Sequence, residues 1–183
     1  MATFNINTFR NKALTAGGAR ANLFDVSMTG PGVATGLSTD EFNFACKGTA
    51  IPTMTVGVVE VQFFGRSIKV PGNKTFDNWT TTVINDEGFE VRNAMEKWMT
   101  AMGTHAGNVS TTTEANLYGS ADVRQHAKKG GIIHTYSFVK IFPVSIGEIT
   151  LGWGENDAIE EFPVEFAYDY WTHNAATGGA IVI

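Results

Sequence analysis

From Leu23 onward, hydrophobic and polar residues mostly alternate with a period of two, which is the spacing of a β-strand that buries one face. The alternation is clearest in residues 42–46 and 59–63, and it predicts a strand in each of these ranges. Residues 79–84 are rich in β-branched residues, which suit a pleated surface, and they are predicted to form a further strand. The chain is therefore expected to be mainly β.

Two longer strands are predicted near the C-terminus, in residues 132–142 and 160–171. In the second of them every other residue is apolar, in one unbroken row, whereas acidic residues occupy the opposite face. This pattern predicts a single strand with the hydrophobic core on one side and water on the other. Its apolar row is Phe162, Val164, Phe166, Tyr168 and Tyr170, and its acidic residues are Glu161, Glu165 and Asp169.

Residues 85–103 break the strand pattern and repeat their apolar positions at the helical period instead. Asn85 or Asp86 can cap the N-terminus of this helix, and Gly103 can end it after about four turns. An apolar stripe of this kind is far more often a packing surface than a cofactor site. The predicted core face of the helix consists of Val91, Met95, Trp98 and Met102.

Residues 1–18, 29–41 and 172–183 are predicted to be loops or tails. The chain is expected to form one domain over residues 1–183, with its core in about 19–171. Its predicted fold class is an antiparallel β-barrel or sandwich with one flanking amphipathic helix. Loops rich in glycine suit a subunit that orders them against its neighbours, and the candidates for such contacts are Gly30, Gly32, Gly36, Asp40 and Glu41.

Net charge, cysteine content and hydropathy exclude several classes of function and site. With a net charge of −5 the chain repels nucleic acid, so a protein that reads DNA in its grooves is not expected. The single cysteine excludes an internal disulfide and paired-cysteine zinc sites. No apolar run is long enough for a signal peptide or a membrane span, so the protein is expected to be made and kept in the cytoplasm without a membrane anchor.

The strongest enzyme candidate is the segment 74–87, where carboxylates lie among hydroxyl groups. A glycosidase-like pair needs two carboxyl groups about 5 to 10 Å apart. Asp77 and Asp86 are instead separated by a predicted strand of about 30 Å, and Asp86 also suits a helix cap. The glycine cluster lacks the dinucleotide-binding spacing, the histidines share no metal-ligand spacing, and Cys46 is interpreted as a core residue. No catalytic, cofactor or metal site is therefore predicted.

The sequence IKVPGNKTFDNWTTTVINDE, residues 68–87, resembles the tail tube proteins of contractile-tailed bacteriophages. Four further blocks occur in the family's order, and together the five span most of residues 19–171. These blocks are ARANLFDV (19–26), FACKGTAIP (44–52), FPVSIGEITLGW (142–153) and IEEFPVEFAYDYW (159–171). The glycine-rich segment 29–41, the extended N-terminus and the tail after Trp171 depart from the family pattern.

The resemblance implies a structural virion protein whose subunits form hexameric rings that stack into a hollow tail tube, with no catalysis by the subunit. It implies a tail sheath protein, baseplate proteins and a tape-measure protein as partners, and assembly in the host cytoplasm. DNA would pass through the lumen, and acidic side chains facing it would repel the phosphates. The candidates for that lining are Glu60, Gln62, Glu161, Glu165 and Asp169.

Other functions fit the sequence less well. A tube or ring protein of a type VI secretion system, a related contractile injection system or a baseplate would share the fold. A small-ligand-binding β-barrel is the alternative from a different class, because 43% of the residues are hydrophobic and such barrels can enclose a cavity. An enzyme is the third choice.

Overall fold

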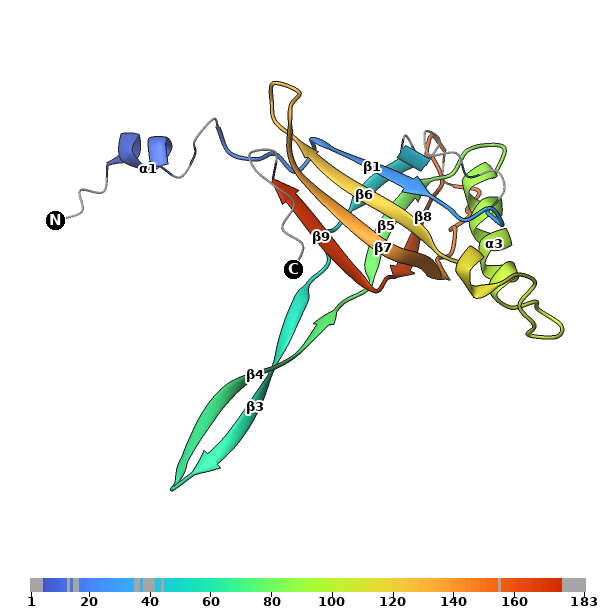
Figure 1. Ribbon diagram of the computed structural model, residues 1–183. Helices are drawn as coiled ribbons and strands as arrows, with labels where there is room; N and C mark the ends of the chain where they lie inside the picture. Colours follow the sequence, from blue (N-terminus) through green and yellow to red (C-terminus); the bar gives the residue numbers. More distant parts are fainter. Residues whose placement is uncertain are drawn as a thin grey trace.

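The computed structural model of the chain describes residues 5–12, 14, 17–34, 37, 42, 43, 45–154 and 156–175. Strands dominate this structure, and Figure 1 shows their arrangement. The strands are β1 (Phe24–Thr29), β2 (Cys46–Thr49), β3 (Met54–Phe63), β4 (Arg66–Phe76), β5 (Trp79–Ile84), β6 (Gly119–His126), β7 (Ile132–Ile146), β8 (Glu161–Ala167) and β9 (Tyr170–Ala175). The helical elements are α1 (Ile6–Lys12), α3 (Glu90–Met102) and the 3-10 turn η2 (Glu114–Asn116).

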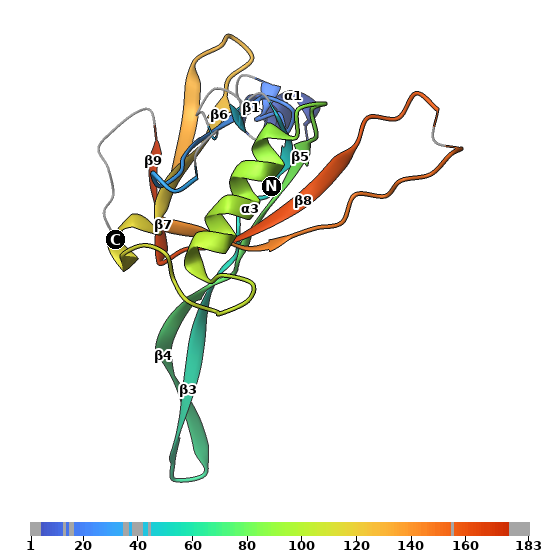
Figure 2. The same cartoon turned by 90° about the vertical axis from the view of Figure 1, so that its right-hand side faces the viewer.

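The strands of the body form a single hydrogen-bonded path that folds into two layers. Its order is β1-β6-β7-β8-β5-β2, with β9 also paired to β7, and the pairings are antiparallel. The first part of β7 pairs with β6 and β9, and its last part pairs with β8. The path therefore makes a β9 layer, β1-β6-β7-β9, and a β8 layer, β7-β8-β5-β2, with α3 beside them (Figure 1, Figure 2). The predicted fold class is confirmed.

Aromatic side chains fill the space between the layers. Trp79 of β5 stacks on Phe138 of β7 with ring centroids 4.7 Å apart, and Phe166 of β8 lies 5.3 Å from the same tryptophan. All three side chains are buried, and the indole N–H of Trp79 donates to Thr49 Oγ1 at 2.8 Å. Because both layers contribute rings to one packed cluster, the alternating apolar residues of β5 and β8 are held facing the core.

Helix α3 packs on this core through the face that the sequence predicts. Val91, Met95 and Trp98 are buried, whereas Met102 is partly buried at the end of the helix. The indole N–H of Trp98 donates to the carbonyl oxygen of Leu117 at 2.7 Å, so this buried donor is satisfied. The stripe is a packing surface, as expected.

Asp86 stabilises the start of α3, although the residue at the N-cap position is Phe89 and neither predicted residue, Asn85 or Asp86, occupies it. Its carboxylate accepts from the backbone N–H of Gly88 at 3.2 Å and of Glu90 at 3.1 Å, and a negative charge there also suits the positive end of the helix dipole. The side chain of Asn85 is engaged elsewhere, since it donates to Glu160 Oε2 at 2.8 Å. At the other end, Gly103 follows the last residue of the helix, as predicted.

The prediction of a strand over residues 42–46 is wrong. Phe42, Asn43 and Ala45 have helical conformation, and the strand β2 begins only at Cys46. Phe42 is nevertheless fully buried in the core. A run of five residues with alternating apolar side chains is too short to separate a strand from a helical turn, because both can bury the same two side chains.

The prediction of one strand over residues 160–171 is also wrong. The strand is interrupted at Tyr168 and Asp169. Before this interruption β8 pairs with β5 and the end of β7, and after it β9 pairs with the start of β7. The apolar row spans this break because both strands face the same core, although Tyr170 at its end is exposed. The predicted C-terminal tail likewise begins inside β9, and the predicted N-terminal tail contains the exposed helix α1.

Candidate assembly surfaces

A long hairpin, β3–β4, leaves the body and stands alone in solvent (Figure 1). It prolongs the β2–β5 pair, because β3 follows β2 and β4 leads into β5. We call residues 54–76 the arm. Every residue of β3 is exposed, so the expected strand over residues 59–63 exists but its expected buried face does not. A two-stranded hairpin has little stability of its own in water, so a partner surface would stabilise the arm.

The outer half of the arm has one apolar face and one polar face. Residues directly opposite on the two strands share a face, and the register pairs Val59 with Val70, Val61 with Ile68 and, at the tip end, Phe63 with Arg66. The other face carries Glu60 opposite Lys69 and Gln62 opposite Ser67. The apolar face, which we define as Val59, Val61, Phe63, Ile68 and Val70, has all five side chains about half exposed. Uncovered apolar side chains in one row are typical of an interaction surface.

The tip of the arm presents two aromatic rings. Phe63 and Phe64 meet edge to face with centroids 4.6 Å apart, and Phe64 is 93% exposed. Phe64 and Gly65 form the two-residue turn and have φ of 44° and 76°, the positive values of a type I′ turn. Asparagine or aspartate normally precedes the glycine in such a turn, and a bulky residue there is strained.

A second projection is the loop between β7 and β8, residues 147–160, seen as the long orange loop beside β8 in Figure 2. Leu151, Trp153 and Ile159 are strongly exposed on it, and the side chain of Trp153 is fully exposed to solvent. The two limbs of the loop enclose a hollow of about 370 Å³. The base is held by Arg92, which donates to the carbonyl oxygen of Gly147 at 3.1 Å. The lining of the hollow is Thr150, Leu151, Gly152, Ala158, Ile159, Glu160 and Glu161.

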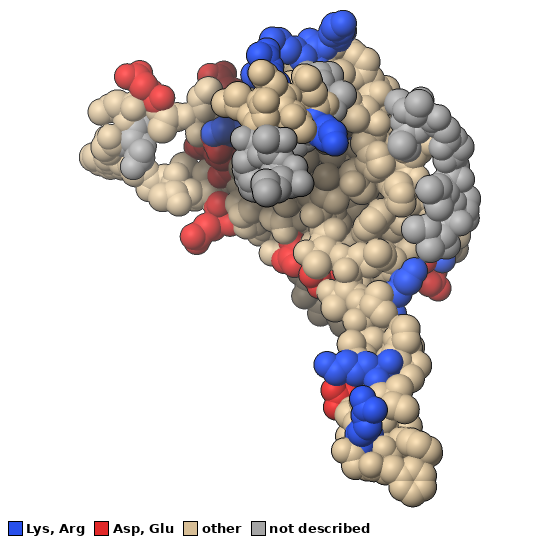
Figure 3. All heavy atoms as spheres, turned by 90° about the vertical axis from the view of Figure 1, so that its left-hand side faces the viewer, with Lys and Arg blue, Asp and Glu red and all other residues tan. Residues whose placement is uncertain are grey.

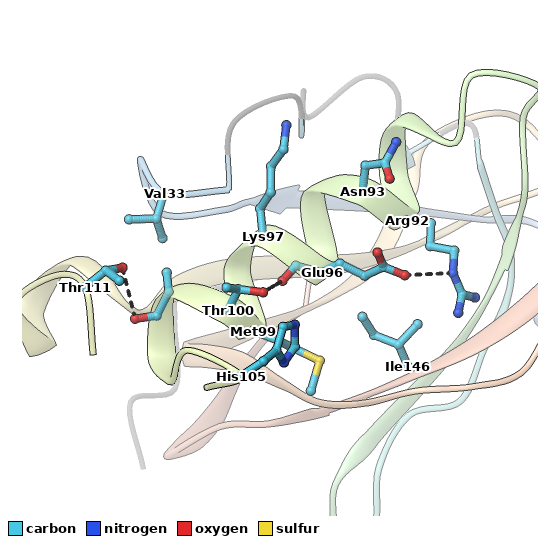
Figure 4. Close-up of a pocket in the computed structure, with 11 residues that line it drawn as sticks. Val33, Arg92, Asn93, Glu96, Lys97, Met99, Thr100, His105, Thr111 and Ile146 are labelled. Carbon is cyan, nitrogen blue, oxygen red and sulfur yellow. Dashed lines mark hydrogen bonds and ion pairs between the residues drawn. The ribbon is translucent and has the colours of Figure 1, made fainter. Parts of the chain in front are cut away.

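A groove of about 790 Å³ follows the outer side of α3 (Figure 4). An ion pair between Arg92 and Glu96, with N and O atoms 3.0 Å apart, lies along it, and Met99 and Ile146 supply apolar surface. The groove is open and lies outside the two layers, whose interior is filled by the aromatic core. It therefore differs from the enclosed cavity of a ligand-binding barrel.

The family described as phage tail tube protein matches residues 19–174 of this chain. The chain belongs to this family. The tail tube protein gp19 of Enterobacteria phage T4 is 35% identical over 154 residues, which cover 84% of this chain and 90% of the phage T4 protein. The tail tube protein of Serratia phage KSP90 is 23% identical over 172 residues, covering 92% and 95% of the two chains. The resemblance inferred from the five sequence blocks is confirmed, and these relatives are structural tube proteins.

Solved structures share the tail tube fold at low sequence identity. A chain of the sheath–tube complex of the PVC extracellular contractile injection system, in its extended state, superposes with a TM-score of 0.64. The two chains are 13% identical, and the superposition covers 94% of this chain and 99% of the other. A chain of the anti-feeding prophage baseplate gives a TM-score of 0.66 at 9% identity, covering 88% and 98%. These likenesses show the fold alone.

The residues expected to line the lumen of a tail tube lie on three separate elements. Glu60 and Gln62 are on the polar face of the arm, and Glu161 and Glu165 are on the face of β8 that points away from the core. Asp169 lies at the bend between β8 and β9. The structure thus groups these residues as two separate pairs, Glu60 with Gln62 and Glu161 with Glu165, and leaves Asp169 on neither element.

Each of these four carboxylates has a polar partner within the subunit. Glu161 forms an ion pair with Lys47, and Glu165 accepts from Asn78 Nδ2 at 2.8 Å. Asp169 pairs with Lys140 at 3.1 Å, and this carboxylate is the first cause of the raised pKa of Lys140. Glu60 lies 4.0 Å from Lys69 on the arm.

The expected assembly loop is only partly described. Gly36, Asp40 and Glu41 lie outside the described residues. Gly30 has a packing role, because a Cβ atom there would lie 2.9 Å from the side chain of Leu37. Gly32 faces open space, so it stays a candidate for contacts between subunits.

The other residues considered for chemistry occupy ordinary structural positions. Cys46 is buried, and burial raises the pKa of its thiol to about 12, so it stays protonated rather than becoming a nucleophile. Asp77 and Asp86 flank the two ends of β5, as predicted. Within the described part of the chain, no three acidic, histidine or cysteine side chains gather to hold a metal ion. No helix in that part is long and apolar enough to cross a membrane.

Sequence reasoning missed the arm, the exposed 147–160 loop and a histidine pair. His134 and His173 stack with ring centroids 5.3 Å apart, although they are far apart in the sequence and no local signal links them. The pKa of His134 is lowered by desolvation first and by the charge of His173 second. The arm did carry a signal, because two alternating apolar runs flank a two-residue turn that ends in glycine.

Proposed function

We propose that this protein builds the tail tube of a contractile-tailed phage as hexameric rings that stack around a lumen through which DNA leaves the virion. Membership of the tail tube family carries the proposal, and the uncovered apolar face of the arm supports it. The tube would assemble in the host cytoplasm on baseplate proteins and around a tape-measure protein, and a sheath would enclose it. Catalysis by the subunit has no part in this role.

Contact between subunits would supply the cover that the apolar face of the arm lacks. Complete burial of a valine, isoleucine or phenylalanine is worth about 1.5 to 3 kcal/mol. The five side chains of the face keep about half of their surface exposed, so covering the rest contributes about 1 kcal/mol each, or about 5 kcal/mol for each arm. Summed over the subunits of a ring, this contribution favours assembly over the free subunit.

For the lumen we propose the outward face of the β8 layer. Glu165 lies opposite Thr80, and Glu161 lies opposite Ile84, so these carboxylates share a mostly polar surface with β5. Carboxylates and hydroxyl groups on such a wall would repel or weakly bind the phosphates of passing DNA. Glu60, Gln62 and Asp169 are weaker candidates, because the arm and the bend hold them on other parts of the subunit.

Two alternatives remain distinguishable. A ring protein of an injection machine would assemble in the same way but without a virion, and the identity to phage tail tube proteins favours the phage. A ligand-binding barrel would remain a monomer, and the filled space between the layers argues against it.

The test is electron microscopy of the purified full chain over a range of concentrations. We expect rings or tubes with a central channel, and cryo-electron microscopy of the tubes should place Glu161 and Glu165 on the channel wall. A protein that stays monomeric at every concentration, also in the presence of its sheath and baseplate proteins, would refute the proposed function. A channel lined by the outward face of the β9 layer would refute only the lumen assignment.

A further inference from the structure

The arm and the 147–160 loop carry opposite charges that are not neutralised within the subunit. Residues 54–76 contain Arg66, Lys69 and Lys74 against one acid, Glu60, and Figure 3 shows basic side chains on the arm. Residues 147–160 contain four acidic residues and no basic one. Among the described residues, Arg66 and Lys74 on the arm and Glu148 and Asp157 on the loop form no ion pair.

These two projections cannot meet within one subunit. Figure 2 shows the arm and the loop leaving the body in different directions, with the tip of the arm far from the loop. Contact between them would therefore join two copies through two different surfaces. Such a head-to-tail contact closes into a ring or continues as a stack, depending on the rotation between the copies.

The shapes of the two surfaces also fit. The tip offers the rings of Phe63 and Phe64, and the loop offers a hollow of about 370 Å³ with Leu151 and Ile159 in its lining. We propose that the aromatic tip of the arm seats between the limbs of the 147–160 loop of a neighbouring subunit, where Arg66 faces the loop carboxylates. This inference rests on the proposed assembly of identical subunits and assigns one contact within it.

The turn at the tip supports a binding role for Phe64. Phe64 has a φ of 44°, at a turn position where asparagine would be unstrained. Among the aromatic pairs of the described residues, its ring meets only that of the neighbouring Phe63. Strained backbone kept at an exposed position points to a function outside the subunit. Exposed aromatic anchors that enter a partner's pocket are typical of the residues that dominate interfaces.

Cross-linking tests the contact directly. Phe64→Cys and Ile159→Cys are combined in the full chain, assembled tubes are treated with a short bismaleimide, and the products are separated by denaturing electrophoresis. We expect a ladder of covalent oligomers. The control combines Phe64→Cys with Val109→Cys, which is also strongly exposed but lies outside the loop, and it should remain mostly monomeric. Native Cys46 is buried and should not contribute.

Charge reversal provides a second readout. Arg66→Glu alone and Asp157→Arg alone should each raise the concentration needed for assembly at least tenfold, and the double variant should recover most of this loss. Lys97→Glu, on the groove of α3, makes the same change of charge elsewhere and should assemble like the wild type.

The outcomes separate this contact from the function as a whole. Tubes that form normally but give no 64–159 cross-link, or that cross-link equally through residue 109, would overturn the contact and leave the proposed function standing. The contact would also be overturned if the double charge variant raised the concentration needed for assembly by the product of the two single-variant factors. A wild-type protein that forms no rings or tubes would overturn both.

Discussion

The substitution Val61→Asp examines the apolar face of the arm most sharply. Val61 is 50% exposed in the free subunit and lies opposite Ile68, so the change removes a cross-strand contact worth about 0.2 to 1 kcal/mol. The core is untouched, and the melting temperature should fall by no more than about 4 °C. In the assembly, the same change removes about 1 kcal/mol of valine burial and places a carboxylate in an apolar contact, which costs about 3 kcal/mol more.

The expected loss of about 4 kcal/mol corresponds to a weakening of roughly a thousandfold for each contact. Sedimentation velocity over a range of concentrations and negative-stain microscopy measure it, while circular dichroism checks that the subunit is folded. Gln62→Asp is the matched control, because it adds the same charge one residue away on the polar face of the arm. Normal assembly of Val61→Asp, or equal disruption by Gln62→Asp, would refute the assignment of the apolar face as an interface.

Three further predictions concern the subunit itself. Burial raises the pKa of Cys46 to about 12 from an ordinary 9.0, so the free energy of unfolding should not depend on this thiol below pH 9 and should fall between pH 9 and about pH 12. A thiol reagent at pH 8 should label Cys46 only as fast as the protein unfolds. Fast labelling of the folded protein would contradict this. The lowered pKa of His134 should appear in a nuclear magnetic resonance titration, with stability declining as pH falls below 6.5. His173→Gln should raise the pKa of His134 only part of the way to its ordinary value, since desolvation is the larger cause of the lowering. A full return to the ordinary pKa would show instead that His173 is the larger cause. Gly119→Ala should cost about 1 to 3 kcal/mol, because its Cβ would lie 2.5 Å from the carbonyl oxygen of Thr29 and 2.9 Å from Trp98, whereas Gly32→Ala, which meets open space, should melt within about 2 °C of the wild type.

Particular elements show where the sequence was a reliable guide. The helix was predicted within a few residues because four apolar positions at the helical period, an acidic residue before the first turn and a following glycine all agree. The strand over residues 79–84 was equally clear, since five of its six residues are β-branched. In residues 42–46 the apolar alternation was too short to decide between a strand and a helical turn, and the structure has helical conformation there with Phe42 buried.

The sequence alone determined the class of fold and the helix with its core face, because periodicity and local caps are properties of neighbouring residues, and the resemblance of its five blocks indicated the family. Only the tertiary structure decided which alternating strands are covered. The apolar residues of β8 and those in the outer half of β3 recur at every second position in the sequence, yet the former are buried in the core and the latter stand in water on the arm. An alternating pattern specifies that a strand has an apolar face, and the partner that covers this face comes from another part of the chain or from another subunit.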